Sequence, residues 1–167
     1  YPYDLFVPGY FYRHDRHFKQ THSAFLDNDL ETMNYMVRRL IIDSLIHFVE
    51  LYKVDGFRFD LMGLLDKDTM NIIREKLILM NPSIMLYGEG WNMENSVPKK
   101  LRSNMNNQEL MPNIGHFNDF YRNVFKGSLH TKELGYATGA NHLEEKAMQG
   151  IIGSPHLFNE PSKSINY

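Results

Sequence analysis

The chain has 167 residues, the length of one ordinary domain, with 43% hydrophobic and 23% charged residues as in a globular protein. The net charge is −2 and basic residues are scattered among acids, so we expect no nucleic-acid partner, which would require clustered Lys and Arg. The absence of cysteine excludes disulfides and thiolate metal sites. No apolar run approaches the roughly 20 residues that cross a bilayer, so we expect no membrane partner.

The first half of the chain begins with an aperiodic segment and continues into a strong helical pattern. Residues 1–30 are aromatic and polar and are interrupted by Pro8 and Gly9, which predicts a long ordered loop. From Met33 onward, apolar residues recur at helical spacing, which predicts an amphipathic helix that ends near Lys53. The predicted apolar face comprises Met33, Met36, Val37, Leu40, Ile41, Ser44, Leu45, Phe48, Val49 and Tyr52.

Two short apolar runs on either side of a second helix predict a βαβ unit. Residues 54–60 and 84–88 are predicted strands, and residues 67–80 form a predicted helix with Asp66 as its N-cap. The predicted buried stripe of this helix comprises Met70, Ile73, Leu77 and Met80. Because the joins are short, the two strands are expected to be parallel neighbours with a right-handed crossover.

The second half of the chain has weaker patterns. A third strand is predicted at 114–118, followed by a short helix through Phe120 and Phe125. The remainder is loop-rich, with a predicted helix at 143–151, and residues 164–167 are expected to open a further strand.

Strand alternation places four charged or polar side chains together. Side chains alternate along a strand, so Arg58 and Asp60 project to one face, and Tyr87 and Glu89 project together from the next strand. Neighbouring parallel strands lie about 4.8 Å apart. If the strands are adjacent, the carboxyl groups of Asp60 and Glu89 stand on the order of 5 Å apart, the separation of the carboxyl pair in retaining glycosidases.

The surroundings of these two carboxyl groups differ. Arg58 favours the ionised form of Asp60, as a nucleophile requires, whereas Glu89 lies between two glycines beside Trp91, where partial burial favours the protonated acid. The alternative is a structural ion pair and a simple Gly-Glu-Gly turn. The order of these residues at successive strand ends favours a site, because α/β barrels keep their sites at the carboxyl ends of parallel strands.

Several linked motifs resemble the α-amylase superfamily (glycoside hydrolase family 13), in the form of its type I pullulanase or debranching branch. Residues 54–63, VDGFRFDLMG, resemble the nucleophile motif of this branch, and residues 86–91, LYGEGW, resemble its acid/base motif. Further similar stretches, in the same order as in that branch, are residues 7–13, 28–29, 36–44, 117–119 with Arg122, and 165–167.

The resemblance implies an α/β fold that is a partial (β/α)8 TIM barrel, roughly strands 4 to 6 and the start of strand 7 with their helices. Residues 1–167 are then the central part of a single catalytic barrel domain, truncated at both ends. The implied activity is retaining hydrolysis of α-1,6-glucosidic bonds in pullulan, starch or glycogen limit dextrins. An α-glucan would be the partner.

The resemblance also implies roles for individual residues. Asp60 is the nucleophile, Glu89 the general acid/base, and Arg58 the residue that orients Asp60. The resemblance makes Trp91 a candidate sugar-stacking residue. Tyr87, on the face of Glu89, and His116, near the end of the third predicted strand, are further candidate substrate-binding residues, and the alternative for His116 is a structural role. No cofactor and no metal are expected.

Other functions and other clusters remain to be weighed. A different specificity of the same superfamily, isoamylase-like or α-1,4, depends on the loops at 1–30 and 91–113, and a catalytically dead carbohydrate-binding homologue is a further alternative. Retention of Arg58, Asp60 and Glu89 argues against a dead homologue. The cluster His14, Asp15, His17 and His22 is predicted to be a solvated or sugar-contacting loop, and Lys99, Lys100 and Arg102 are predicted to be a solvated loop face.

We expect the isolated 167-residue chain to be inactive. The branch that it resembles has a third carboxylate, in a His-Asp motif expected after residues 165–167, and an Asn-His motif expected before Tyr1, and both bind the sugar at the cleaved bond. A partial barrel also exposes unpaired strand edges, which favour aggregation over an active fold. The check is pullulan hydrolysis by the purified 167-residue chain, and measurable turnover contradicts the expectation.

Overall fold

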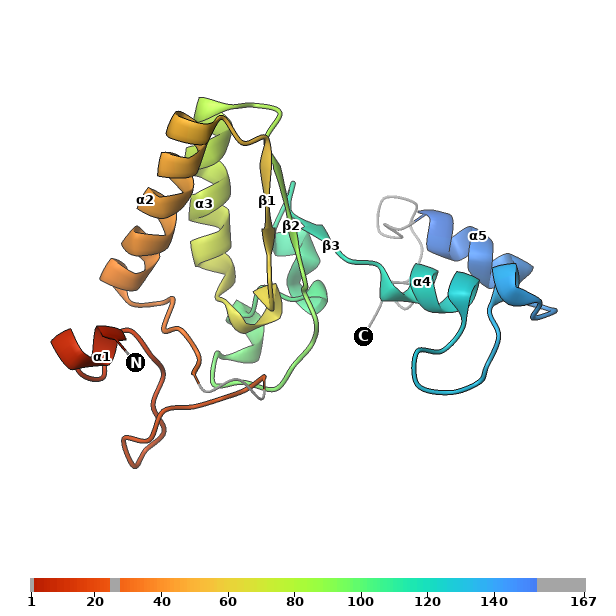
Figure 1. The fold of residues 1–167 in the computed structure, drawn as a ribbon, viewed down its shortest axis with the longest axis horizontal. Helices are drawn as coiled ribbons and strands as arrows, with labels where there is room; N and C mark the ends of the chain where they lie inside the picture. The colour runs from red at the N-terminus through yellow and green to blue at the C-terminus, as the bar shows by residue number, and fades with distance from the viewer. Residues whose placement is uncertain (1, 25–27, 153–167) are drawn as a thin grey trace. The chain divides into compact units, whose positions relative to one another are not determined.

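The computed structural model describes residues 2–24 and 28–152, and the chain divides into two compact units. Unit 1 comprises residues 1–116 and unit 2 comprises residues 117–167 (Figure 1). Each unit is described by itself.

Unit 1 begins with a short helix that the sequence patterns did not predict. Helix α1 spans Pro2–Phe6, within the segment expected to be loop. Proline at a first helical turn costs nothing, because its missing N–H would have no helical partner there. The other described residues of the segment form a loop, held by isolated antiparallel bridges that pair Tyr12 with Leu30 and His14 with Gln20.

Helix α2 spans Tyr35–Tyr52 and ends where it was predicted to end. Lys53 adopts a left-handed conformation with φ 54° and donates its N–H to the Val49 carbonyl, which closes the last turn. The predicted apolar face is too wide: Val37 and Val49 are buried, but the flank of the stripe is exposed. The exposed members are Met33, Met36, Leu40, Ser44, Phe48 and Tyr52. Part of this flank lines an open groove of about 670 Å³ together with Tyr3 and Phe11.

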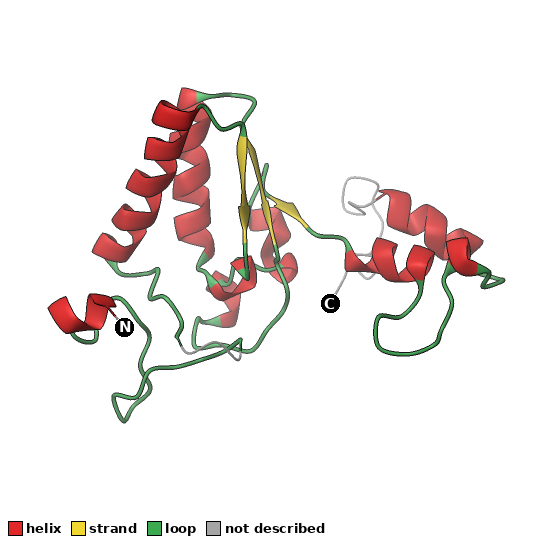
Figure 2. Cartoon of the chain, in the orientation of Figure 1, coloured by secondary structure: helices red, strands yellow, loops and turns green. Residues whose placement is uncertain are grey.

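The predicted βαβ unit is confirmed. Strand β1 (Gly56–Phe59) and strand β2 (Met85–Gly88) are parallel neighbours, and helix α3 (Lys67–Met80) connects them. Arg58 pairs in register with Tyr87, and Phe59 with Gly88. Figure 2 shows α2 and α3 on the same side of the strands, as expected when one sheet face is apolar.

Strand β3 (Gly115–His116) completes a parallel sheet in the order β1-β2-β3 among the described residues. It is shorter than the predicted strand at 114–118. Residue 117 marks the start of unit 2, so the extended segment leaves the sheet there.

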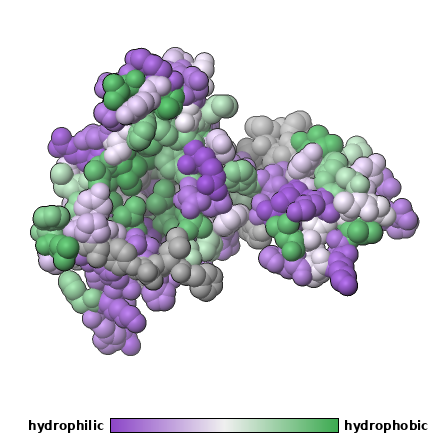
Figure 3. Space-filling view, viewed as in Figure 1, coloured by the Kyte–Doolittle hydropathy of each residue, from purple (hydrophilic) through white to green (hydrophobic). Residues whose placement is uncertain are grey.

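The core of unit 1 lies between α2, α3 and one face of the sheet. Its buried members are Val49, Met62, Met70, Ile73, Leu77, Ile84, Leu86, Met111 and Ile114. Each such side chain contributes about 1.5–3 kcal/mol by leaving water. Met80, predicted to be buried, is 38% exposed because it lies at the end of α3. Figure 3 shows hydrophobic atoms gathered across the middle of this unit, with hydrophilic atoms around them.

The long connection from β2 to β3 and the join from β1 to α3 contain short 3-10 turns, one of them kinked at Asn107. These turns are η1 (Met62–Leu64), η2 (Lys99–Leu101) and η3 (Met105–Leu110). Such turns let the chain reverse without exposing many unpaired backbone groups.

Residues 117–152, the described part of unit 2, contain two α-helices near their predicted positions. Helix α4 spans Asp119–Lys126 and helix α5 spans Glu144–Ile152, with the turn η4 (Tyr136–Thr138) between them. The Asn118 side chain caps α4 by accepting from the Tyr121 N–H at 2.9 Å, and it donates to the Gly150 carbonyl of α5 at 3.1 Å.

Two further sequence predictions concern the strand at 164–167 and the membrane. The strand expected to open at 164–167 lies outside them. Within residues 2–24 and 28–152, no helix is long and apolar enough to span a membrane.

We expect Asp66 to stabilise the turn between β1 and α3. Its side chain is buried and accepts from the Thr69 N–H at 2.9 Å, the Thr69 hydroxyl at 2.6 Å and Arg38 at 3.3 Å. Burial alone would raise the pKa of Asp66, but bonds from Thr69 and Thr32 and the charge of Arg38 outweigh it, so the pKa lies below its usual value. Asp66→Ala should lower the free energy of unfolding by about 3–5 kcal/mol, because it removes the cap and leaves Arg38 without its carboxylate partner.

Thermal unfolding of the protein tests the role of Asp66. Asp66→Asn, which keeps the capping acceptor, is the matched variant and should cost less. Because the folded pKa is depressed, the contribution is complete above the usual carboxyl pKa and is lost as the pH falls through the folded pKa. Equal stability of the wild type and the alanine variant at neutral pH contradicts the assignment.

Candidate active site

Arg58, Asp60 and Glu89 meet where β1 and β2 end. The Arg58 guanidinium donates from Nη1 to Asp60 Oδ1 at 3.0 Å and from Nη2 to Glu89 Oε1 at 2.7 Å. The two carboxylates are therefore held on one planar cation. The parallel register explains this meeting, because it places Phe59 beside Gly88 and so brings the next residues, Asp60 and Glu89, to the same end of the sheet.

Glu89 is fixed more firmly than Asp60. Its side chain is 13% exposed, and its second oxygen accepts from the Leu61 N–H at 2.9 Å. Its backbone N–H donates to the Phe59 carbonyl at 3.0 Å, and its own carbonyl accepts from the Gly63 N–H at 2.9 Å. Both the main chain and the carboxylate of Glu89 are thus tied to the segment that carries Asp60.

Leu61 supplies a donor that sequence reasoning missed. It adopts a left-handed conformation with φ 46° and ψ 40°, which is unusual for a branched residue. Such a conformation costs on the order of 1–3 kcal/mol and concentrates at functional sites. Here it turns the backbone directly after Asp60 so that the Leu61 N–H meets the Glu89 carboxylate. No property of the leucine side chain signals this role.

The Asp60 side chain is the open member of the pair. It is 69% exposed, and Arg58 binds its Oδ1 atom. An exposed carboxylate thus lies next to a largely buried one. Different surroundings for these two carboxyl groups were predicted from their neighbours, Arg58 beside Asp60 and Trp91 beside Glu89.

Tyr87 and Trp91 lie on either side of Glu89 along the chain. Tyr87 pairs in register with Arg58 and is 40% exposed, so it stands on the open face of the sheet as predicted. Trp91 is partly buried, and its carbonyl approaches the backbone so closely that a β-carbon at Gly63 would collide with it. Only glycine fits at position 63 without moving the Trp91 backbone.

His116 lies on the other side of the sheet end. It pairs in register with Gly88, whose neighbours are core residues, and a β-carbon at Gly90 would collide with its Nδ1 atom. Neither ring nitrogen, both buried, has a hydrogen-bond partner among the described residues. Burial lowers the pKa of His116 to about 4. The structure thus places His116 beneath the turn that carries Glu89, rather than on the face of Tyr87.

The basic run in the β2–β3 connection is not the solvated face that was predicted. The Lys99 side chain is 81% exposed, but Arg102 is 3% exposed and its guanidinium binds backbone carbonyls of the loop. The composition of the run does not show which of its basic residues is buried, because an arginine is the same residue type whether loop carbonyls or water surround it.

The described residues give no sign of a metal centre. No group of three or more His, Cys, Asp or Glu side chains among them could hold an ion. In the first loop, His14 instead approaches Asp4 at 3.6 Å.

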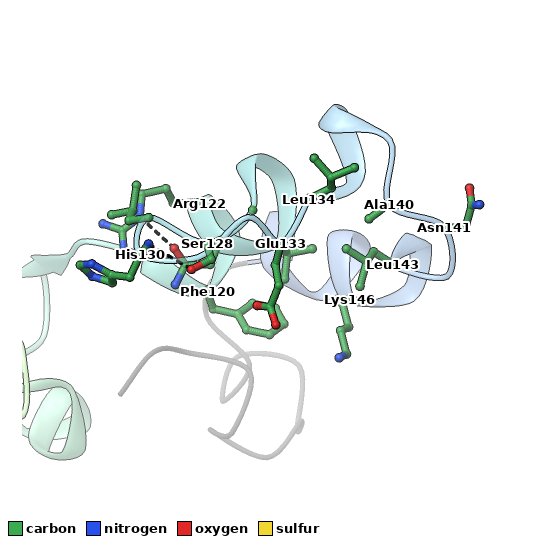
Figure 4. Close-up of a pocket in the computed structure, with 14 residues that line it drawn as sticks. Phe120, Arg122, Ser128, His130, Glu133, Leu134, Ala140, Asn141, Leu143 and Lys146 are labelled. Carbon is green, nitrogen blue, oxygen red and sulfur yellow. Dashed lines mark hydrogen bonds between the residues drawn. The ribbon is translucent and has the colours of Figure 1, made fainter.

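Unit 2 contains a separate hollow of about 650 Å³ between α4 and the loops that follow it (Figure 4). Leucines and Phe120 line it together with Arg122, His130 and Lys146. Among the described residues of its lining, Glu133 is the one acid. The ends of β1 and β2, by contrast, hold two carboxylates together on one guanidinium.

Comparisons with known proteins find pullulanases. Over 173 aligned positions the chain is 39% identical to the pullulanase of Bacillus subtilis (strain 168), covering 99% of this chain and 24% of that protein. Type I pullulanase from Bacillus subtilis str. 168 complexed with maltose matches with a TM-score of 0.88 and 40% identity over 92% of this chain and 22% of that one. Pullulanase complexed with maltotriose from Anoxybacillus sp. LM18-11 matches with a TM-score of 0.88 and 38% identity over 93% of this chain and 22% of that one.

These matches confirm the resemblance to pullulanases that the sequence motifs indicated. No protein-family model matches the chain. The chain spans about a quarter of the length of the Bacillus relative, so the similarity is to one segment of a larger protein. The α/β arrangement with three parallel strands agrees with the pullulanase structures.

We expect His116 to make the protein less stable in acid. The unfolded chain takes up a proton near pH 6.5, whereas the folded chain does so only near 4. Stability therefore falls as the pH drops from 6.5 towards 4, by on the order of 3 kcal/mol for full burial. Denaturant unfolding of the full protein at neutral pH and near pH 4 should show a smaller acid-induced loss in His116→Phe than in the wild type. An equal loss in both proteins contradicts the placement of a neutral buried His116.

Proposed function

We propose that this chain, which is homologous to one segment of the pullulanases, carries the catalytic carboxylates of a retaining glycoside hydrolase that cleaves α-1,6-glucosidic bonds in pullulan, starch or glycogen limit dextrins. One observation carries the proposal: a single guanidinium, Arg58, binds Asp60 and Glu89 at the ends of adjacent parallel strands. Retaining glycosidases need two carboxyl groups close enough to act on the same glycosidic bond.

In the first step, Asp60 is the nucleophile. Its oxygen that Arg58 does not hold attacks the anomeric carbon, and the bond from that carbon to the glycosidic oxygen breaks. Glu89 gives its proton to the departing oxygen, so the leaving chain is a neutral alcohol. Glu89 Oε1 accepts from Arg58 in the free protein. When substrate binds, this oxygen must face the glycosidic oxygen, so its hydrogen bond with Arg58 is replaced by one with the substrate.

In the second step, water releases the glycosyl group from Asp60. Glu89, now ionised, takes a proton from the water as the water oxygen bonds to the anomeric carbon, and the bond to Asp60 breaks. Two displacements at one carbon retain its configuration. Arg58 binds Asp60 whenever that carboxylate is free, so it orients the nucleophile at the start of each cycle.

The neighbouring aromatic residues suit a sugar ligand. Tyr87 is exposed on the face of the sheet that carries Arg58, and an aromatic ring there offers a flat apolar surface with a polar end. We assign Trp91, which follows the acid/base turn, as a stacking residue. His116 lies against Gly90 beneath the Glu89 turn, so we propose that it supports the substrate region through the backbone of this turn and not by direct contact with the sugar.

The fold in this proposal is a partial (β/α)8 barrel, roughly strands 4 to 6 and the start of strand 7, with residues 1–167 as the central part of one catalytic barrel domain. The parallel order β1-β2-β3 and the helices on one sheet face support it. In such barrels the site lies at the carboxyl ends of the strands, where Asp60 and Glu89 lie here.

The substrate class rests on the relatives. Solved pullulanases with 38% and 40% identity hold maltotriose and maltose, which are α-glucan fragments. The proposal requires no cofactor, because both displacements use carboxyl groups and water. Retention of the Arg58, Asp60 and Glu89 contacts speaks against a catalytically dead homologue, since three clustered charges are costly to keep without a use.

We expect the full protein that contains this segment to hydrolyse pullulan, and Asp60→Asn to lower kcat/KM by at least about 10⁴-fold, because the amide cannot form the glycosyl ester. Glu89→Gln should lower kcat/KM on pullulan by about 10²–10⁴-fold, the usual contribution of general acid catalysis. The measurement is reducing-sugar release, with mass spectrometry to find a covalent glycosyl group on Asp60.

Asp43→Asn provides the matched control for these substitutions. Asp43 is exposed and binds Arg39 on the surface of α2 at 3.1 Å, so the same chemical change should leave turnover unaltered. Unchanged turnover in Asp60→Asn or Glu89→Gln overturns the residue assignment. Activity on α-1,4 linkages alone would overturn the proposed bond specificity.

A further inference from the structure

We propose that Arg102 is a positioning residue for the acid/base Glu89, acting through the loop that follows it. The inference rests on the proposed function, because it assigns Glu89 the role of proton donor. The loop, residues 91–104, leaves the site after Trp91 and returns at Asn104. Arg102 lies inside it.

The Arg102 guanidinium holds the loop by several hydrogen bonds. Nε donates to the Val97 carbonyl at 2.8 Å, Nη1 to the Met93 carbonyl at 3.2 Å, and Nη2 to the Asn95 carbonyl at 2.7 Å. Nη2 also binds the Glu94 carboxylate at 3.2 Å. The planar fork of arginine can meet these spread acceptors at once, which one ammonium group cannot do.

Burial of Arg102 increases the contribution of these hydrogen bonds to the stability of the loop. The Arg102 side chain is 4% exposed, whereas its ion-pair partner Glu94 is 78% exposed. Hydrogen bonds to a charged, buried group are worth more than exposed ones, and removing the guanidinium leaves its carbonyl acceptors unpaired. The bond to Glu94 lies at the solvent edge and contributes little. The carbonyl bonds are therefore the part of the cluster that orders the loop.

The ordered loop is joined to the turn that carries Glu89. At its end, the Met105 N–H donates to the Gly90 carbonyl at 3.0 Å, directly after Glu89. In its middle, the Asn95 side chain donates to the Gly63 carbonyl at 3.4 Å, and the Gly63 N–H in turn donates to the Glu89 carbonyl. The conformation that Arg102 enforces thus reaches both sides of the Glu89 main chain.

A displaced Glu89 affects acid catalysis more than nucleophilic attack. The loop end bonds directly beside Glu89, because the Met105 N–H donates to the carbonyl of Gly90, whereas on the Asp60 side the Asn95 side chain reaches Gly63, three residues after Asp60. A misplacement of about 1 Å can cost 10²-fold in rate. Loss of Arg102 should therefore slow substrates whose leaving group needs a proton and spare those whose leaving group does not.

The experiment compares Arg102→Ala and Arg102→Lys in the full protein with pullulan and with α-maltotriosyl fluoride, whose fluoride leaves without a proton. We expect kcat/KM on pullulan to fall by about 10–100-fold in Arg102→Ala and less in Arg102→Lys. On the fluoride, the fall should be under about 3-fold in both, because kcat/KM there reports attack by Asp60 without acid help. Glu94→Gln is the matched control and should match the wild type on both substrates.

Outcomes of this experiment separate the inference from the proposed function. Equal falls on both substrates, or no fall on pullulan, overturn the positioning role of Arg102. If Arg102→Ala does not fold, Arg102→Lys carries the same comparison. Failure of the wild type to cleave pullulan overturns the proposed function instead. Hydrogen exchange over residues 91–97 then still tests whether the Arg102 hydrogen bonds order the loop. Faster exchange in Arg102→Lys than in Glu94→Gln supports this ordering role, and equal exchange overturns it.

Discussion

The parallel pairing of β1 with β2 is the constraint on which the rest of unit 1 depends. Its register sets Arg58 beside Tyr87 and Phe59 beside Gly88, so the residues that follow each strand emerge at one edge. Every contact of Glu89 described above crosses this pair: its backbone bonds to Phe59 and Gly63, and its carboxylate bonds to Arg58 and Leu61. A slip of one residue would turn Arg58 to the core face and separate the two carboxylates.

One face of this sheet is apolar and packs against helices, and the other face is polar and carries the candidate site. One face buries aliphatic side chains of α2 and α3 and supplies most of the stabilisation. The other carries Arg58, Tyr87 and the nearby carboxylates, which gain little from burial. This separation lets a strained backbone at Leu61 and a cluster of three charges persist, because the core beneath holds the strand ends in place.

Comparison of the sequence patterns with the structure shows where local information suffices. Helix α3 spans the predicted residues 67–80 and begins directly after the predicted cap Asp66, since a cap acts through neighbouring residues. The face of α2 was predicted too wide, because periodicity reports which residues are apolar and not which of them a partner covers. Arg102 was placed in solvent for the same reason: its burial depends on loop carbonyls that no spacing rule reveals.

The sequence by itself determined the βαβ order, the alternation that aims Arg58 and Asp60 to one side, and the motifs that resemble pullulanases. These features depend on the period of a strand or helix, which is a local property of the backbone. Only the tertiary structure decided that one guanidinium holds both carboxylates, that the Leu61 N–H reaches Glu89, and that Arg102 orders the following loop. Each of these is a contact across separate elements or a backbone turn, and its geometry exists only once the strands pair.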